Sequence, residues 1–256
     1  MLDWDNFSFR DRDLEHKVYY KGSGPAVLIM HELPGLVPEC VQFARRIVDR
    51  GYTVYLPLFF GQPNQPMSLL GTLKYTFHIC ISKEFRTLAK NKSSPITEWL
   101  RALCRDIYAK CGGVGVGAIG MCLTGGFALS LMIDERVMAP VLSQPSLPFS
   151  ISREHRKALG ISPEELEKAK QRAKECPILA LRYEEDSISP ADRFETLKQE
   201  FGDNIELYII SEQQRKDSGI KTSIPHAVLT VHAFEEAIVR VLKFLDARLK
   251  PINNPN

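Results

Sequence analysis

The chain has 256 residues, of which 44% are hydrophobic and 25% are charged, and its formal net charge is +2. This balance is typical of a soluble globular protein, and the length suits one large α/β domain. A net charge this close to zero does not favour nucleic acid as a partner, and no apolar stretch is long enough to span a membrane. The first residues are acidic and lack the basic and apolar regions of a secretion signal, so we expect a cytoplasmic protein.

The first part of the chain predicts a hairpin region followed by a strand–helix–strand unit. The expected elements are a strand at 16–21, a strand at 25–30, a helix at 37–50 and a strand at 52–60. Two strands joined by a helix imply a parallel sheet. Residues 67–94 are less regular, and we expect either a lid or an extra helix there.

The rest of the chain alternates helices and strands and shows no repeat or second domain. The expected elements are helices at 97–111, 127–133, 163–174, 190–201 and 231–249, and strands at 114–119, 137–142, 177–183 and 205–210. The charged helix at 163–174 is expected to lie in solvent, a polar loop is expected up to Pro225, and the tail 250–256 is expected to be flexible. We therefore predict one domain over residues 1–256, with a mostly parallel central sheet flanked by helices on both faces.

One turn combines a candidate nucleophile with small neighbours. The apolar run 114–119 ends at Gly120, and Cys122 follows before Thr124 and two glycines. A strand, a sharp turn and a helix, with a nucleophile at the turn, form a nucleophile elbow. The strained turn needs neighbours with little side-chain bulk, and the N-terminus of the following helix lowers the pKa of a thiol. Cys122 is therefore the candidate nucleophile, whereas the other five cysteines lie in apolar or helical segments and lack a CxxC pair.

A cysteine nucleophile needs a base and an acid that orients the base, and in hydrolases with such an elbow the acid follows a later strand. The turn after strand 177–183 contains Asp186, which begins an Asp-x-Ile-x-Pro pattern. Glu184 and Glu185 are competing candidates, and all three residues are also compatible with an ordinary solvated acidic turn.

The base is expected in the loop before the last helix, where His226 lies. His232 is the rival, and we expect it in the first turn of that helix, where the helix dipole disfavours an imidazolium. The order of Cys122, Asp186 and His226 along the chain favours a functional interpretation over three unrelated residues.

An oxyanion hole needs two backbone N–H groups. Leu123, which follows the nucleophile, provides one, and the loop after strand 25–30 provides the other. Because Pro34 has no N–H, the candidate in that loop is Leu33. Glu32 would stand beside the site, where its carboxylate could contact the thiol or position a water, unless it faces solvent.

These segments together resemble the dienelactone hydrolase family of the α/β-hydrolases, from about residue 22 to residue 249. The resemblance rests on Gly120–Gly126, on His31–Gly35, on Asp186 in its turn and on His226–Thr230. It implies an α/β-hydrolase fold and a triad of Cys122, His226 and Asp186, with Glu32 as a helper carboxylate. It also implies no metal and no cofactor, and hydrolysis of a lactone or another small carboxylic ester through an acyl-thioester.

The chain departs from the family pattern in two ways. Thr124 stands where the first glycine of the usual G-x-C-x-G-G elbow would be. The arginines that bind a substrate carboxylate in the family match none of Arg86, Arg182 and Arg193 by motif.

Two other functions compete with hydrolysis. Residues 115–120 match the dinucleotide pattern G-x-G-x-x-G, but a helix precedes them and the glycines alternate with the apolar residues of the expected strand. A binding protein without catalysis on a hydrolase scaffold is the second alternative, because a fold does not fix a function.

Overall fold

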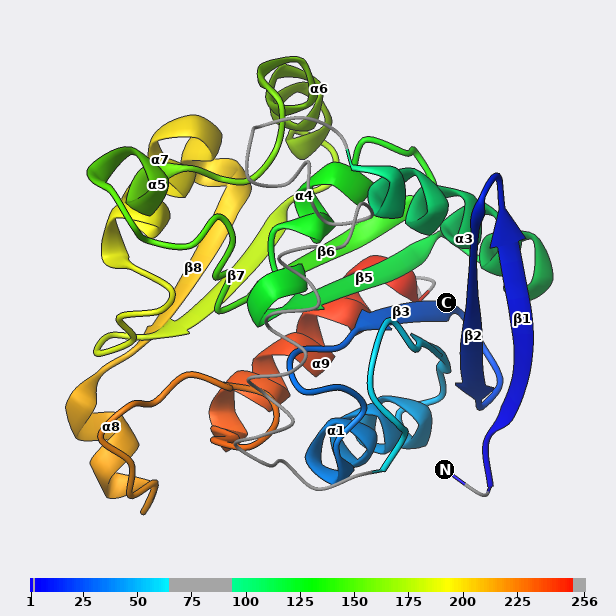
Figure 1. Cartoon of the computed structure of the whole chain (residues 1–256), viewed down its shortest axis with the longest axis horizontal. Coiled ribbons are helices and arrows are strands. Elements are labelled where there is room, and N and C mark those ends of the chain that lie inside the picture. Colours follow the sequence, from blue (N-terminus) through cyan, green and yellow to red (C-terminus); the bar gives the residue numbers. More distant parts are fainter. Residues whose placement is uncertain (2, 65–93, 251–256) are drawn as a thin grey trace, which may run out of the picture.

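The computed structural model describes residues 1, 3–64 and 94–250. The lid or helix expected at 67–94, apart from Ser94, and the flexible tail beyond Lys250 lie outside the described residues. Within the described part, one eight-stranded sheet runs in the order β1-β2-β4-β3-β5-β6-β7-β8 (Figure 1). The strands are β1 (Asp5–Asp11), β2 (Leu14–Lys21), β3 (Ala26–Met30), β4 (Thr53–Pro57), β5 (Val116–Met121), β6 (Val137–Ser143), β7 (Ile178–Tyr183) and β8 (Ile205–Ile210).

The first two strands form the expected hairpin region, and β2 continues antiparallel onto β4. From β4 to β8 all neighbouring strands are parallel. Parallel strands bring their carboxyl ends to one edge of the sheet, and in open α/β sheets this edge is where ligands bind. The expectation of a mostly parallel sheet in an α/β fold is therefore confirmed.

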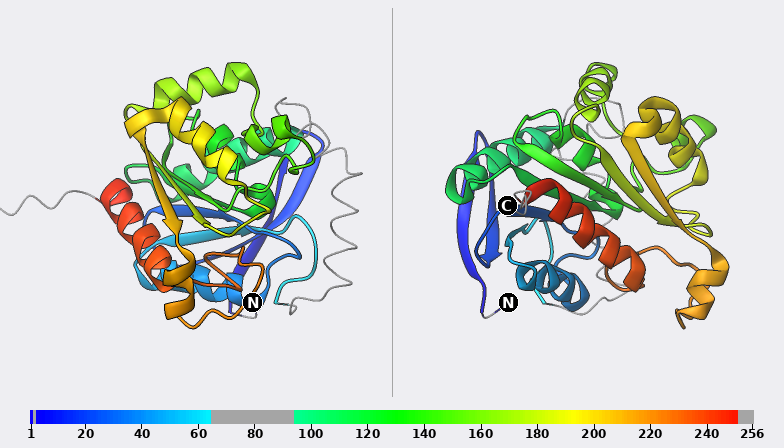
Figure 2. Two further views of the ribbon diagram at one scale, coloured as in Figure 1. Left: turned by 90° about the vertical axis from the view of Figure 1, so that its left-hand side faces the viewer. Right: turned by 180° about the vertical axis from the view of Figure 1, so that it is seen from behind.

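Helices cover both faces of the sheet (Figure 2). The cluster on one face includes residues of α1 (Pro38–Asp49) and α9 (Glu235–Leu249), and the cluster on the other includes residues of α3 (Pro95–Cys111), α4 (Phe127–Leu131), α6 (Pro163–Ala173) and α7 (Ala191–Phe201). Adjacent residues of β3 enter opposite clusters, since Val27 packs with α1 and α9 while Leu28 packs with α3 and α4. This alternation explains why parallel strands buried on both sides are apolar without interruption.

Several element boundaries differ from those expected. Strand β5 covers 116–121 and not 114–119, because Gly120 and Met121 still pair with β3 and β6. Strand β4 ends at Pro57, before residue 60, and α9 begins at Glu235, four residues later than expected. The residues before α9 form tight turns, in which the N–H of Phe234 donates to the carbonyl of Val228 at 3.0 Å.

Two short helices, α5 (Arg153–Lys157) and α8 (Glu212–Asp217), lie in segments where the sequence pattern predicts none. A signal for α8 was present. The Ser211 hydroxyl accepts the N–H of Gln214, and the Gln214 side chain accepts the N–H of Ser211. This reciprocal capping box starts a helix within what was interpreted as a polar loop.

Helix α6 is not merely solvated, as we expected from its charges. Ala169 and Ala173 are buried, and so is Glu165, which forms an ion pair with Arg101 of α3. The sequence pattern hides this contact because the partner lies on another helix.

The loop after β6 is anchored by a buried arginine from α7. The Arg193 guanidinium donates to the carbonyls of Ala158, Pro145, Pro148 and His155 at 2.6–2.9 Å. Burial lowers the pKa of Arg193 to about 10. Among the described residues, the guanidinium binds backbone carbonyls and no carboxylate. The loop at 145–148 therefore depends on Arg193 for its position.

Replacing this arginine should destabilise the fold strongly. Arg193→Met leaves buried carbonyls without donors, and we expect the free energy of unfolding in urea to fall by at least about 3 kcal/mol. Arg156→Met is the matched control, because Arg156 is 44% exposed and pairs with Asp192 at the surface. Equal losses in the two variants would contradict the anchoring role.

Candidate active site

Cys122 stands at the sharp turn that the sequence predicts. Its φ is +53°, in the left-handed region that residues with a side chain rarely adopt. A Cβ on Gly120 would lie 2.2 Å from the carbonyl oxygen of Thr124, and one on Gly125 would lie 2.6 Å from the Cα of Pro145. Both glycines are therefore required by close backbone contacts at the turn.

The helix after the turn is shorter than expected. Cys122 begins a single 3₁₀ turn, η2 (Cys122–Thr124), and α4 starts only at Phe127 and has five residues. The helix dipole beside the sulfur is therefore weaker than that of the longer helix we expected, because a short helix aligns few peptide dipoles.

Thr124 explains how the elbow tolerates a residue other than glycine. Its hydroxyl donates to the carbonyl of Met30 at 2.8 Å and accepts the N–H of Met121 at 3.0 Å. Met30 is the last residue of β3, directly before His31 and Glu32. The threonine therefore ties the elbow to the start of the loop that carries the other candidate groups.

Asp186 and His226 form a directed pair. The Nδ1 of His226 lies 2.7 Å from Oδ2 of Asp186, whose other oxygen accepts the N–H groups of Ile188 and Ser189. Burial disfavours the imidazolium, but the charges of the Cys122 sulfur and of Asp186 raise the pKa of His226 well above its usual value. The ring is therefore suited to accept a proton on Nε2, which is buried and has no hydrogen-bond partner among the described residues.

Glu32 is buried beside this pair. Its carboxyl accepts hydrogen bonds from Thr230 and from Nε2 of Gln144, and burial raises its pKa. A carboxylate oxygen of Glu32, the sulfur of Cys122 and an imidazole nitrogen of His226 lie within 4.8 Å of one another. The structure thus brings together the candidate nucleophile, base and helper carboxylate from three distant parts of the chain.

Ser146, which belongs to no motif in the sequence, contacts the candidate nucleophile. Its hydroxyl lies 3.3 Å from the sulfur of Cys122, and its N–H donates to the Cys122 carbonyl at 2.9 Å. Gln144 and Thr230 were missed in the same way. Their positions in the chain could have identified them. Gln144 and Ser146 follow β6, the neighbour of the strand before Cys122, and Thr230 lies shortly after His226.

The loop with the candidate oxyanion donor Leu33 is held by His31. The His31 ring donates from Nδ1 to the carbonyl of Glu32 and accepts the N–H of Phe59 at Nε2. The Gly35 N–H also donates to the Glu32 carbonyl, at 2.9 Å. Because N–H and C=O point to opposite sides of a trans peptide, the Leu33 N–H is directed away from these contacts. Leu123, the other candidate donor, lies in the 3₁₀ turn after Cys122.

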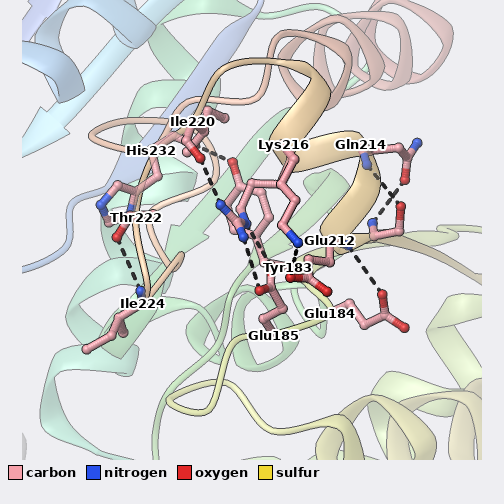
Figure 3. A network of polar contacts seen from close by, with 12 residues as sticks. Tyr183, Glu184, Glu185, Glu212, Gln214, Lys216, Ile220, Thr222, Ile224 and His232 are labelled. Atoms are coloured by element: carbon pink, nitrogen blue, oxygen red, sulfur yellow. Dashed lines mark hydrogen bonds and ion pairs between the residues drawn. The ribbon is translucent and has the colours of Figure 1, made fainter.

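His232 has a different position from the one expected. It precedes α9 and is not in its first turn, so the dipole argument against it was wrong. Its Nδ1 accepts the N–H groups of His226 and Ala227 at 3.2 and 3.3 Å, and the Tyr183 hydroxyl donates to its carbonyl (Figure 3). Burial, and then the charge of His226, lowers the pKa of His232. His232 therefore holds the backbone that carries His226.

The competing acid Glu185 has a structural partner. Arg215 of α8 binds Glu185 through Nε at 2.7 Å and Nη2 at 3.1 Å, and its Nη1 donates to the carbonyl of Ile220 at 2.8 Å. Figure 3 shows Glu185 and Ile220 at this contact, with Tyr183 beside them. Glu185 precedes Asp186 and Ile220 belongs to the segment leading to His226, so Arg215 connects the two turns. Glu184 accepts the N–H of Glu212.

The arginines considered for a substrate carboxylate are bound elsewhere. Arg182 donates to the carbonyls of Glu184 and Asp186, each at 3.0 Å, and Arg193 holds the loop after β6. Arg86 lies outside the described residues.

The dinucleotide pattern lies mostly inside strand β5, and its glycines serve packing. A Cβ on Gly115 would lie 2.3 Å from Cγ of Met138, and one on Gly117 would lie 2.9 Å from Cδ2 of Leu245. The pattern therefore fails the condition that it follow a strand and open a helix.

Arg215 should matter for the reactivity of Cys122 although it does not touch the thiol. Arg215→Met removes the connection between the two turns. We expect alkylation of Cys122 by iodoacetamide at neutral pH to slow about tenfold, because a small displacement of the candidate base His226 from the sulfur lowers the reaction rate. Lys216→Met is the matched control, since Lys216 is 56% exposed and pairs with Glu212. Unchanged alkylation in Arg215→Met would rule out the connection.

The buried His31 should make the stability of the fold sensitive to acid. Burial lowers its pKa to about 4, so between about pH 6.5 and 4 the unfolded state binds a proton that the folded state does not. Stability should fall as the pH falls through this range, by up to about 3 kcal/mol from this group. The check is urea unfolding across the range, in which His31→Gln should show a smaller pH slope than the wild type.

Comparison of the sequence with known proteins identifies a family and a relative. The sequence profile of the Dienelactone hydrolase family matches residues 17–214. A carboxylesterase of Bacillus subtilis (strain 168) is 23% identical over 182 residues, which are 66% of this chain and 65% of the carboxylesterase. The chain thus spans about two thirds of that relative.

Solved structures of low sequence identity share the fold. An esterase from an Arctic intertidal metagenomic library is 16% identical, with a TM-score of 0.62 over 96% of this chain and 93% of its own. A putative dienelactone hydrolase from Klebsiella pneumoniae is 17% identical, with a TM-score of 0.59 over 96% and 97%. A dienelactone hydrolase from Anabaena variabilis is 14% identical, with a TM-score of 0.62 over 97% and 99%. With an α/β-hydrolase fold and a family match over most of its length, the chain belongs to the dienelactone hydrolase family.

Proposed function

We propose that this protein hydrolyses a lactone or another small carboxylic ester, with Cys122 as nucleophile, His226 as base and Asp186 as the acid that orients the base. The observation that carries the proposal is the convergence of these groups. The sulfur of Cys122, a nitrogen of His226 and the Glu32 carboxylate lie within 4.8 Å of one another, and Asp186 binds His226 at 2.7 Å. Family membership and the carboxylesterase relative support the same reaction class.

The first half of the reaction forms an acyl-thioester. Nε2 of His226 takes the proton of the Cys122 thiol, and the sulfur attacks the ester carbonyl carbon. The N–H groups of Leu33 and Leu123 stabilise the oxyanion that develops. When the tetrahedral intermediate collapses, the carbon–oxygen bond of the ester breaks and the imidazolium returns its proton to the leaving alcohol.

The second half releases the acid. His226 takes a proton from water, the hydroxide attacks the thioester carbonyl, and the thiolate leaves and is protonated again. Asp186 keeps the ring in the tautomer with the hydrogen on Nδ1, so Nε2 is the site of proton transfer in both halves. Glu32 lies close enough to position the water, and its hydrogen bonds from Thr230 and Gln144 fix its orientation.

Family membership and the carboxylesterase relative favour a small-molecule ester as the substrate. Arg182 and Arg193 are bound to backbone carbonyls, so neither is proposed to bind a substrate carboxylate.

Within the described residues, none of the helices combines the length and apolar character needed to cross a bilayer. We propose that the protein acts in the cytoplasm, where a free catalytic thiol stays reduced.

The decisive test is hydrolysis of p-nitrophenyl acetate. Cys122→Ala should lower turnover at least about a thousandfold, and His226→Asn should cost a similar factor. Cys111→Ala is the matched control, because Cys111 is half-buried against the hydroxyl of Tyr55 and takes no part in the proposed reaction.

Activity that survives in Cys122→Ala would contradict the assignment of the nucleophile. If the wild type hydrolyses neither this ester nor a panel of lactones, thiol labelling separates a narrow substrate range from a binding protein. Burial raises the pKa of Cys40, Cys104 and Cys176, so Cys122 should react faster than these three if the site is functional.

A further inference from the structure

Three different metal-ligand atoms lie close together in the site, one each from Glu32, Cys122 and His226. A carboxylate oxygen, a sulfur and an imidazole nitrogen lie within 4.8 Å of one another. Thiolate, imidazole and carboxylate are the ligand types that Zn²⁺ takes in proteins. We propose that these residues form a site for a thiophilic divalent cation such as Zn²⁺, and that the bound ion reversibly stops hydrolysis. Binding stands on the geometry alone, whereas the inhibition rests on the proposed function.

The hydrogen bonding of His226 leaves one ring nitrogen available as a metal ligand. Its Nδ1 is bound to Asp186 at 2.7 Å, and its Nε2 is buried without a hydrogen-bond partner among the described residues. A histidine that ligates a metal usually gives its other nitrogen to a carboxylate or carbonyl, which fixes the ring and increases its basicity. Asp186 fills this supporting place.

Glu32 is held in position as the oxygen ligand. Its two oxygens accept hydrogen bonds from Thr230 and from Gln144. Each carboxylate oxygen has two lone pairs, so one on each oxygen remains for a cation. A divalent cation also compensates the negative charges that a buried carboxylate and a thiolate bring into one place.

The spacing is close to what a tetrahedral ion requires. Bonds of about 2.0–2.3 Å to zinc place neighbouring ligand atoms roughly 3.3–3.7 Å apart. Because the three atoms lie within 4.8 Å, they need to approach one another by only about 1 Å. Cys122 is partly exposed, which provides access at the sulfur, and three protein ligands leave a fourth position for water.

Binding removes both reactive groups from the reaction without any redox change. The thiol proton goes to the solvent as the sulfur–metal bond forms, and the metal occupies the lone pair of Nε2. The sulfur then no longer attacks a carbonyl and the ring no longer accepts a proton. The ion is thus an inhibitor and takes no part in the reaction itself, and a chelator should restore activity.

The test uses Co²⁺ as a visible probe on the full chain. Thiolate bound to Co²⁺ gives a charge-transfer absorption in the near ultraviolet, and Zn²⁺ should displace the Co²⁺ and remove the band. We expect one equivalent to bind the wild type, no band in Cys122→Ser, and binding at least about tenfold weaker in Glu32→Gln. Cys111→Ser should bind like the wild type. Thermal unfolding of each metal-free variant shows that it is folded.

A band that persists in Cys122→Ser, or equal affinity in Glu32→Gln, would overturn the site. Inhibition of ester hydrolysis by Zn²⁺ should follow occupancy and be reversed by EDTA, and inhibition unrelated to occupancy would overturn the regulatory part. Failure of the proposed function looks different. In that case the Co²⁺ band appears with the expected variant pattern, but no ester is hydrolysed.

Discussion

The backbone of Cys122 is the constraint on which the site depends. A residue with a side chain is held at a φ of +53°, and the surrounding contacts have to compensate for the strain. Gly120 and Gly125 permit the close approach of Thr124 and Pro145, and the Thr124 hydroxyl fastens the turn to the end of β3. The Cys122 carbonyl accepts the N–H groups of Gly125 and Ser146, which closes the turn on both sides. The position of the sulfur is therefore set by backbone contacts from three strand ends.

Buried arginines arrange the loops around this turn. Arg193 binds four carbonyls around the loop after β6. Arg182 binds two carbonyls in the turn after β7, which carries Asp186. Arg215 joins that turn to the segment before His226. A guanidinium suits this task because its planar fork offers five N–H donors in fixed directions. Loops have few backbone partners of their own, so a donor that gathers several carbonyls replaces the hydrogen bonds that a strand or helix would supply.

Much of the fold and the candidate site was predictable, and the misses have physical causes. Strands buried on both sides produce uninterrupted apolar runs, and helices produce a periodic stripe, so most elements were found. Element ends were less accurate, because the start of α9 depends on turns around Val228 and the end of β5 on pairing with its neighbours. The role of His232 was misjudged for this reason. Helix α8 was missed although Ser211 and Gln214 carried its capping signal.

The sequence by itself determined the alternation of strands and helices, the elbow around Cys122 and the chain order of Cys122, Asp186 and His226, because these features are local patterns of residue type and spacing. Only the tertiary structure decided which side chains meet. Ser146 at the sulfur, Gln144 and Thr230 on Glu32 and Arg215 between two turns are contacts between residues distant in the chain. Such contacts depend on the register of neighbouring strands and on the paths of the loops, which no local pattern encodes.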